Sequence, residues 1–264
     1  MNYSLQHRFL KNLPKKLNNL YNKNKVKSLN VKNKSKKNKL YDPVTNFDKL
    51  FEKFIRSLIK KNFSKDGIIG EEFLKKKSEN SFMWSIDPID GTRAFVMGIP
   101  TWSNLISVSE NGIPKIGLAN FPELDKYYIS DKNRSYVFKR NKKTVLRSSK
   151  IFNLKKIKII GNFHGKLFNI RKNEIIKRFG LSLRLASLDA LSYCLLAEGK
   201  VDVVIESNLK QYDILPLIPI IEKSGGFVST WKNERPEMGG NILATSNFIL
   251  HKKILSILKT LTNK

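Results

Sequence analysis

Hydrophobic positions in the first half of the chain recur at a helical period and later as short runs. Between residues 47 and 61 apolar side chains return every three or four positions, which predicts an amphipathic helix. Residues 8–22 repeat this spacing around Pro14. From residue 67 onward the apolar runs are short and end at turn-forming residues, as is typical of strands. The predicted strands are residues 67–70, 82–86, 102–109, 113–120, 127–130 and 135–139.

After residue 149 strands and helices alternate. Apolar runs of strand length are followed by segments with helical spacing, and this order is typical of an α/β unit. The predicted strands are residues 156–161, 183–185 and 201–205, and the predicted helices are residues 170–179, 190–198 and 214–223. We therefore expect two subdomains, a first of residues 1–148 with α+β character and a second of residues 149–264 with α/β character.

The composition permits an ordinary globular core. The 264 residues are 41% hydrophobic and 10% aromatic. No apolar run approaches the roughly 18 residues that a membrane helix requires, and residues 1–8 lack the charged-then-apolar design of a secretory signal. The single cysteine, Cys194, lies in an apolar run and excludes an internal disulfide. We expect a cytoplasmic protein without membrane contact.

The formal net charge of +28 is unusual for a chain of this size. A strongly basic surface can bind nucleic acid by releasing counterions from its phosphates. Here the lysines are spread along the chain, and the Lys/Asn-rich residues 26–40 are expected to form a loop or an irregular hairpin. Basic residues do not alternate with aromatic ones in any recognisable nucleic-acid motif. The charge therefore favours a solvated surface that attracts anionic substrates, and it argues against nucleic acid as the partner.

The segment from Trp84 to Phe95 carries the most informative chemistry in the sequence. Asp87 and Asp90 follow an apolar strand, and Gly91 and Thr92 come next, where the pattern becomes helical. Hard divalent cations bind several converging carboxylate oxygens. The first N–H groups of a helix are suited to binding phosphate. Together these features predict metal-assisted chemistry on a phosphate ester.

Four motifs, which occur in the chain in the order found in the family, resemble the inositol monophosphatase family of metal-dependent phosphatases. The run Asp87–Thr92 reads D-P-I-D-G-T, the family signature. Upstream lie Gly70-Glu71-Glu72 and a D-x-V-T-x-x-D run from Asp42 to Asp48. Downstream, Tyr212-Asp213 precedes E-K-S-G-G at residues 222–226. The resemblance covers about residues 42 to 245 and implies a five-layered αβαβα sandwich, an α+β fold with the active site between its two halves.

The resemblance also implies the metal ligands. Glu71 and Asp87 would hold a first ion together with the Ile89 carbonyl oxygen. A second ion would be held by Asp87, Asp90 and Asp213. All-oxygen ligation favours Mg²⁺, with two or three ions in the working enzyme. The first subdomain would carry most of these ligands, and the second would close the active site.

The same resemblance assigns the reaction centre. The N–H groups of Gly91 and Thr92 would bind the phosphate, and Thr92 with Asp48 would orient and deprotonate the attacking water. Simpler roles also stay open, with Thr92 and Asp48 as caps of the helices that they begin. Arg93 would bind phosphate or reach across to a second subunit, since a homodimer is the family expectation. Glu72 would support the site or remain solvated.

Two further carboxylates bear on the choice of phosphate ester. Glu206 stands where the family presents a carboxylate to the substrate, and Asp189 lies 17 residues before it. Typical inositol monophosphatases carry a small apolar residue at the position of Asp189, whereas the histidinol-phosphatase branch carries Asp. Carboxylates suit the ammonium and imidazole groups of histidinol phosphate better than a neutral polyol. The runs at residues 90–102 and 209–220 also resemble that branch, although Gln211 and the neighbours of Asp189 depart from it.

These residues favour one function and leave two alternatives. We expect a Mg²⁺-dependent histidinol-phosphatase that acts on a small-molecule phosphate ester. Within the same chemistry, the alternative substrate is inositol 1-phosphate or another sugar phosphate, and Asp189 could be no more than a helix N-cap. The third candidate is a basic nucleic-acid-associated protein on this fold, which the loss of a metal ligand would favour. No histidine falls in a motif, so none is expected to act in catalysis.

Overall fold

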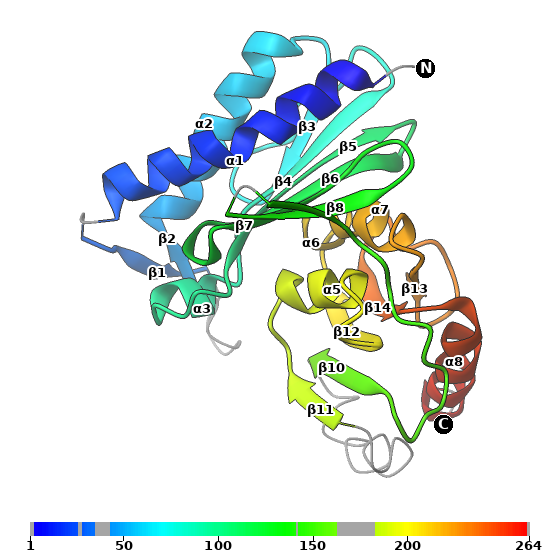
Figure 1. Cartoon of the computed structure of the whole chain (residues 1–264). Helices are drawn as coiled ribbons and strands as arrows, with labels where there is room; N and C mark the ends of the chain where they lie inside the picture. The colour runs from blue at the N-terminus through cyan, green and yellow to red at the C-terminus, as the bar shows by residue number, and fades with distance from the viewer. Residues whose placement is uncertain (1–2, 26–27, 35–42, 141, 163–182, 263–264) are drawn as a thin grey trace.

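The computed structural model describes residues 3–25, 28–34, 43–140, 142–162 and 183–262 (Figure 1). The helix predicted over residues 170–179 lies outside the described residues. Within these ranges the chain forms a seven-stranded sheet, a five-stranded sheet and a two-stranded ladder. The ladder pairs β1 (Val31–Asn33) with β2 (Pro43–Thr45) in antiparallel fashion.

The seven-stranded sheet has the order β3-β4-β5-β6-β7-β8-β9. Its strands are β3 (Gly67–Gly70), β4 (Phe82–Asp90), β5 (Ser103–Glu110), β6 (Ile113–Phe121), β7 (Lys126–Ser130), β8 (Ser135–Lys139) and β9 (Lys142–Val145). All neighbours are antiparallel except β3 and β4, which are parallel. Asn111 and Gly112 join β5 to β6 with φ of 51° and 81°, the left-handed conformation that a tight hairpin requires.

The five-stranded sheet has the order β11-β10-β12-β14-β13 and mixes parallel with antiparallel pairs. Its strands are β10 (Lys158–Asn162), β11 (Leu183–Ala186), β12 (Val203–Leu209), β13 (Phe227–Thr230) and β14 (Gly240–Thr245). The predicted strand at residues 201–205 therefore begins later and runs farther. This extension carries residues 206 and 207 to the inner end of the sheet.

Helices and sheets alternate in five layers (Figure 1). The first layer is α1 (Ser4–Asn24) and α2 (Asn46–Asn62), which cover one face of the larger sheet. Between the two sheets lie α5 (Ala190–Ala197), α6 (Gln211–Ile214) and α7 (Leu217–Glu222). Helix α8 (Phe248–Thr262) covers the outer face of the smaller sheet. Two short pieces complete the description, α3 (Thr92–Val96) and a 3₁₀ turn (Pro122–Leu124). The predicted αβαβα sandwich is confirmed.

Three apolar cores hold the layers together. One lies between the first two helices and the larger sheet, and another packs α8 on the smaller sheet. The central core joins both sheets through the middle helices and contains residues from both predicted subdomains, so the boundary at residues 148 and 149 stays a prediction. Helix α1 runs through Pro14 without ending there, because its apolar stripe is fully buried at Leu10, Leu13 and Leu17.

The helix predicted over residues 214–223 is two helices in the structure. Helix α6 ends at Ile214, and α7 begins at Leu217 after Pro216 as its N-cap. Leu215 and Pro216 keep helical backbone angles, but proline has no N–H to continue the helical hydrogen bonds. The apolar periodicity therefore continues across a break in the helix. The break leaves Asp213 on a short separate turn of helix that faces strand β4.

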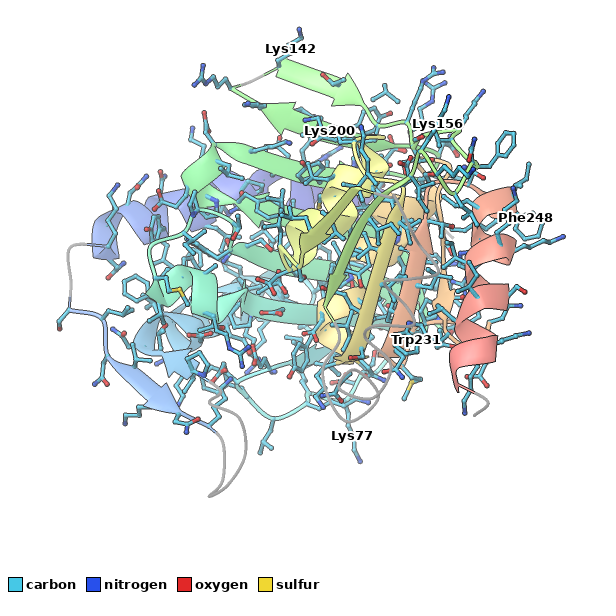
Figure 2. All side chains as sticks on the ribbon, turned by 90° about the horizontal axis from the view of Figure 1, so that it is seen from below. Lys77, Lys142, Lys156, Lys200, Trp231 and Phe248 are labelled. Atoms are coloured by element: carbon cyan, nitrogen blue, oxygen red, sulfur yellow. The ribbon has the colours of Figure 1, made fainter. Side chains whose placement is uncertain are left out.

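Lysine side chains are distributed over the surface. Lys77 and Lys142, for example, project from opposite sides of the molecule (Figure 2). Among the described residues no helix is long and apolar enough to cross a membrane. Cys194 is buried in α5 as a free thiol, as predicted.

The imidazole of His251 is buried between two hydroxyl groups. Its Nε2 lies 2.9 Å from Ser229 Oγ and its Nδ1 lies 2.9 Å from Thr245 Oγ1. Burial lowers the pKa of His251 from 6.5 to about 4. The ring therefore stays neutral in the folded protein at a pH where the unfolded chain binds a proton.

This burial predicts a loss of stability in acid. The contribution of His251 is fully present above pH 6.5 and is lost as the pH falls from 6.5 to about 4. Urea unfolding at pH 7 and pH 5 should show that the native chain loses roughly 1 to 2 kcal/mol more than His251→Gln over this interval. Equal losses in the two proteins would contradict the expected protonation.

Candidate active site

A bulge at the end of β4 turns two carboxylates to the same side of the sheet. Asp87 pairs with Leu105 and Asp90 pairs with Ser103, so β4 advances by three residues where β5 advances by two. In a regular strand, residues three apart point to opposite faces. The extra residue brings Asp87 and Asp90 into one pocket. Asn104 supports the bulge by donating from Nδ2 to the Pro88 carbonyl oxygen at 2.7 Å.

The turn after the bulge depends on Gly91. Its φ of 77° is left-handed, and a Cβ at this position would lie 2.7 Å from Asp189 Oδ2. Gly91 is the N-cap of α3 and Thr92 is the first helical residue, so the interpretation of Thr92 as an N-cap is wrong. The Thr92 hydroxyl instead donates to the Ile89 carbonyl oxygen at 2.9 Å. Arg93 is exposed on α3 and does not line the pocket.

Asp48 has a capping role and also a free carboxylate oxygen. Its Oδ2 accepts hydrogen bonds from Thr45 N at 2.7 Å and from Thr45 Oγ1 at 2.6 Å, which completes a capping box at the start of α2. The predicted capping role is therefore confirmed. Its Oδ1 is buried with no hydrogen-bond partner among the described residues. Joint action of Asp48 and Thr92 on a water stays a prediction, since each is bonded to another group here.

Glu52 fixes the turn that presents Glu71. The Glu52 side chain is fully buried in α2, and its Oε2 accepts a hydrogen bond from the Glu72 N–H at 2.7 Å. Its Oε1 accepts one from Arg56 Nε at 2.7 Å. Only glycine fits at position 70, because a Cβ there would lie 2.1 Å from Glu52 Oε1. A buried ion pair in α2 thus positions an acid at the end of β3.

Asp48, Glu71 and Glu72 form an acidic cluster beside this turn. One carboxylate oxygen from each lies within 4.8 Å of the others, which no other set of three acidic side chains achieves among the described residues. The Lys34 ammonium reaches the cluster, 2.9 Å from Glu71 Oε1 and in contact with Glu72. Burial opposes the charge of Lys34, but the two glutamates outweigh it and raise its pKa. The Lys/Asn-rich N-terminal stretch therefore contributes a cation to the edge of the site.

Asp213 and Asp90 join the two halves of the molecule. Asp213 lies on α6, where its Oδ2 accepts the Lys210 N–H at 2.7 Å, and it faces Asp87 closely enough to share a hydrogen bond. Asp90 Oδ2 accepts the Ala190 N–H from the start of α5 at 2.8 Å. Each acid is thus held by a backbone donor, and both lie where the middle helices meet strand β4.

A second group of polar side chains faces these acids across the pocket. Asp189 precedes α5 with φ of 50° and ψ of −138°, a conformation that non-glycine residues rarely adopt. Asp189 is the N-cap residue of α5, as the alternative had it, but its side chain makes no capping hydrogen bond. Glu206 comes from β12 and accepts a hydrogen bond from Ser187 Oγ, which in turn accepts the Asp189 N–H at 3.0 Å.

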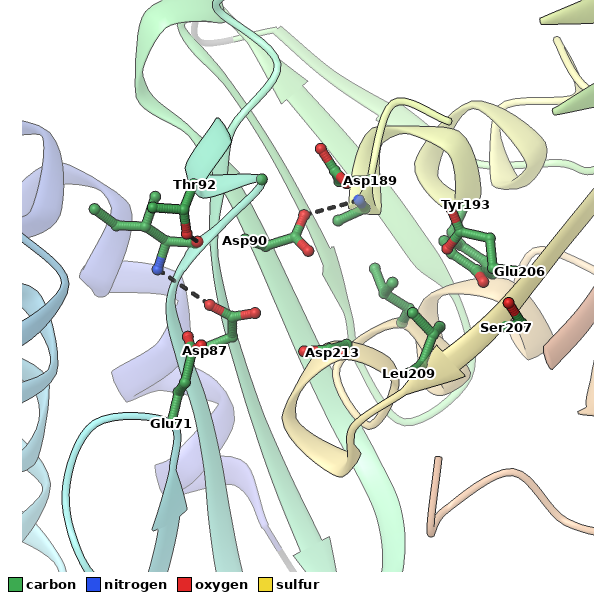
Figure 3. Close-up of a pocket in the computed structure, with 14 residues that line it drawn as sticks. Glu71, Asp87, Asp90, Thr92, Asp189, Tyr193, Glu206, Ser207, Leu209 and Asp213 are labelled. Atoms are coloured by element: carbon green, nitrogen blue, oxygen red, sulfur yellow. Dashed lines mark hydrogen bonds between the residues drawn. The ribbon is translucent and has the colours of Figure 1, made fainter. Parts of the chain in front are cut away.

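All the predicted site residues except Asp48 and Arg93 line one pocket with a volume of about 170 Å³ (Figure 3). Its walls come from the end of β4, the start of α5, the end of β12 and α6. Six of the lining residues carry carboxylates and three carry hydroxyl groups, and the full set is Glu71, Asp87, Ile89, Asp90, Gly91, Thr92, Asp189, Ala190, Tyr193, Glu206, Ser207, Leu209, Asp213 and Leu217. Acids from both halves of the chain therefore converge on one small space.

Burial of so many acids raises their pKa values. Burial is the largest cause at every site, and neighbouring carboxylates add to it. The pKa rises to about 7 at Glu71, to about 6 at Asp213 and to about 8 at Glu206. At Asp87 and Asp90 the pKa lies well above its usual range. The pocket thus holds more buried negative charge than its own hydrogen bonds compensate.

The donor set fits hard divalent cations. Six carboxylates line the pocket without an imidazole or thiol ligand among the described residues, and one buried oxygen of Asp48 lacks a partner. No three of the described acids Glu71, Asp87, Asp90 and Asp213 bring their oxygens within 4.8 Å of one another in this structure. Oxygen-only ligands are the preference of Mg²⁺, and bound cations would offset the charge that raises these pKa values. Glu71, Asp87, Asp90 and Asp213 could hold such ions, with the Ile89 carbonyl at the same edge.

Comparisons with known proteins place the chain in one family. The profile of the inositol monophosphatase family matches residues 7–263. The histidinol-phosphatase of Mycobacterium tuberculosis is 29% identical over 225 residues, which are 81% of this chain and 84% of that protein. A fructose-1,6-bisphosphatase/inositol-1-monophosphatase of Aquifex aeolicus is 28% identical over 242 residues, covering 89% and 87%.

Solved structures agree on the fold. The inositol monophosphatase of Zymomonas mobilis superposes with a TM-score of 0.81 at 24% identity, over 98% of this chain and 99% of that one. The chain belongs to the inositol monophosphatase family, whose members are metal-dependent enzymes. It is a phosphatase that hydrolyses phosphate monoesters.

Three supporting residues were missed from the sequence. Glu52 carries a charge on the apolar stripe of α2, between Phe51 and Ile55, and that misplaced charge was the available signal. Tyr193 lies in an apolar run, and this pattern predicts a residue of the hydrophobic core. Lys34 lies in a low-complexity stretch, where no local pattern separates it from its neighbours.

Proposed function

We propose that the protein is a Mg²⁺-dependent phosphatase that hydrolyses histidinol phosphate to histidinol and inorganic phosphate. The observation that carries this proposal is the placement of Asp189 and Glu206. Both line the same pocket as the predicted metal ligands, yet they come from the second half of the chain and lie toward its far wall (Figure 3). They would meet the leaving group rather than the phosphate.

The acids at the β4 end would hold the metal ions. Glu71, Asp87, Asp90 and Asp213 are the proposed ligands, with the Ile89 carbonyl oxygen. When bound, two or three Mg²⁺ ions would neutralise the phosphate oxygens and lower the pKa of water. A solved structure of an IMPase/NADP phosphatase in complex with Mg²⁺ and phosphate has the same fold, with a TM-score of 0.81.

The remaining residues near α3 would position the reactants. The N–H groups of Gly91 and Thr92 are proposed to bind phosphate oxygens. The free Asp48 Oδ1 is a buried acceptor close to Glu71, and it would take the proton of the attacking water with help from the Thr92 hydroxyl. Arg93 is exposed on α3, where contact with a second subunit suits it better than contact with phosphate.

The far wall would select the alcohol. Histidinol carries an ammonium and an imidazole, and both form strong hydrogen bonds to carboxylates. Asp189 and Glu206 would supply these partners, while Leu209 and Leu217 provide apolar surface for the carbon chain. Histidinol-phosphatases of Mycobacterium tuberculosis and Chlorobaculum parvum are among the relatives, which supports this substrate and a place in histidine biosynthesis.

Inositol 1-phosphate is the alternative substrate. Relatives from Aquifex aeolicus and Thermotoga maritima carry inositol-1-monophosphatase in their names. A nucleic-acid-associated role has less support, because all four proposed metal ligands are present and line one pocket. A homodimer in the cytoplasm is the assembly and location that we propose.

The substrate proposal is tested by phosphate release. Purified protein with Mg²⁺ should hydrolyse histidinol phosphate with a kcat/KM at least about tenfold above that for inositol 1-phosphate. Chelation of the metal by EDTA should abolish both activities, and added Mg²⁺ should restore them. A preference for inositol 1-phosphate would overturn the proposal.

Asp189→Ala should weaken only the reaction with histidinol phosphate. A hydrogen bond to a charged group contributes about 1.5 to 3 kcal/mol, so kcat/KM should fall by roughly 10- to 100-fold. The value for inositol 1-phosphate should change by less than about threefold. Asp189→Asn keeps the shape without the charge and should resemble the alanine variant. Equal losses on the two esters would remove the role of Asp189 in selectivity.

A further inference from the structure

The hydroxyl group of Tyr193 lies inside the active-site pocket, and the proposed mechanism does not use it. The residue belongs to α5, one turn after Asp189, and only 1% of it is exposed. Its ring is part of the central core, whereas its hydroxyl end faces the pocket beside Glu206 (Figure 3). Among the described residues this hydroxyl makes no well-formed hydrogen bond. A buried hydroxyl without a partner is costly unless a ligand or a movement completes it.

Glu206 is the group nearest to completing that hydrogen bond. It is 4% exposed and accepts a hydrogen bond from Ser187 Oγ. The Tyr193 hydroxyl approaches it from the helix side and favours its charged form. A carboxylate has room for several donors, so Ser187 and Tyr193 can both bind it while it faces a cation in the pocket.

We propose that Tyr193 is a positioning residue that aims Glu206 at the cationic leaving group. This inference rests on the proposed function, since it concerns the same pocket and the same substrate class. The Tyr193 hydroxyl donates to Glu206 when the ligand is bound, and Ser187 fixes the carboxylate from the other side. A neutral leaving group gains less from this arrangement, because its hydroxyls form weaker hydrogen bonds to a fixed carboxylate than a cation does.

The geometry also explains why the hydroxyl is kept in a buried position. Phenylalanine would fill the same core space without burying a polar atom that lacks a well-formed hydrogen bond, so packing alone does not account for the hydroxyl. The benefit appears only when a ligand fixes Glu206. The hydroxyl of Tyr193 thus serves ligand binding rather than packing of the core.

The test is a comparison of Tyr193→Phe with the native enzyme on two esters. With Mg²⁺ present, the KM for histidinol phosphate should rise about tenfold while kcat changes less than about twofold. The Kd for histidinol, measured by calorimetry on the Mg²⁺-loaded protein with phosphate, should rise by a similar factor. Both kinetic constants for inositol 1-phosphate should stay within about twofold. Tyr127→Phe is the matched control, because Tyr127 lies on β7 outside the pocket, where it stacks on Phe138 of β8.

A double-mutant cycle separates positioning from packing. In a Glu206→Gln background, Tyr193→Phe should weaken histidinol binding by less than about twofold, because the hydroxyl acts through the carboxylate. Additive losses, an unchanged KM and Kd in the single variant, or equal losses on both esters would each overturn the inference. If the native enzyme prefers inositol 1-phosphate, the proposed function falls instead. The same cycle run on that ester then decides whether Tyr193 acts through Glu206.

Discussion

Asp90→Asn should abolish turnover while leaving the fold intact. Asp90 is a proposed ligand of the second metal ion, and its Oδ2 accepts the Ala190 N–H at the start of helix α5. Asparagine keeps that acceptor and removes the charge. We expect kcat/KM for any phosphate ester to fall by about a thousandfold or more, which corresponds to about 4 kcal/mol of transition-state stabilisation.

The same substitution should not destabilise the metal-free protein. Burial, with Asp189 nearby, raises the pKa of Asp90 well above its usual range, so the native fold gains nothing from this charge without metal. Thermal unfolding in EDTA should show an unchanged or higher melting temperature for the variant. Stabilisation by Mg²⁺ should be smaller than in the native protein. Asp125→Asn, at an exposed turn with φ of 46°, is the matched control. Near-native turnover with normal metal dependence would contradict the assignment of Asp90.

Gly117→Ala should severely destabilise the fold and impair the site. Gly117 lies on β6 where the loop before α7 crosses the larger sheet, and an added Cβ would lie 1.8 Å from the Pro216 carbonyl oxygen. The obstacle is backbone, so it cannot rotate away. We expect a loss of about 3 kcal/mol or more in the free energy of unfolding, at the upper end of the range for overpacking.

Activity should fall with stability in this variant. Pro216 follows Asp213 by three residues, so displacement of the loop moves Asp213 away from Asp87. Urea unfolding and phosphate release measure the two effects. Gly112→Ala is the control, because Gly112 has φ of 81° and open space around it, and its strain alone should cost about 1 kcal/mol. If Gly117→Ala lowers the free energy of unfolding no more than Gly112→Ala does, the loop at Pro216 moves at little cost and the prediction is wrong.

Much of the fold was predictable because it rests on local patterns. The helix predicted over residues 47–61 is α2, and the five strands predicted between residues 82 and 139 are all present within a few residues. The apolar stripe of a helix and the short apolar runs of strands indicate directly which face of each element is buried. Strands β13 and β14 and helix α8 were not predicted, although α8 is strongly apolar. Strand β14 pairs with β12, far away in the sequence, β13 pairs with β14, and α8 packs on the sheet that these strands form.

The site was predictable by motif, but its geometry was not. D-P-I-D identifies Asp87 and Asp90, yet only the bulge against β5 shows how acids three apart face one pocket. Likewise the apolar periodicity across Pro216 concealed the break that gives Asp213 its own short helix. Supporting contacts such as Glu52 with Glu72 join segments 20 residues apart, and one sequence carries no direct record of such contacts.

The most direct test of this account locates the metal ions. Crystals soaked with Mn²⁺ should give anomalous density between Glu71 and Asp87 and between Asp87, Asp90 and Asp213, with carboxylate oxygens as ligands. Well-ordered crystals that bind Mn²⁺ only elsewhere on the protein, with no density in this pocket, would contradict the central claim that these acids form the metal site of a phosphatase.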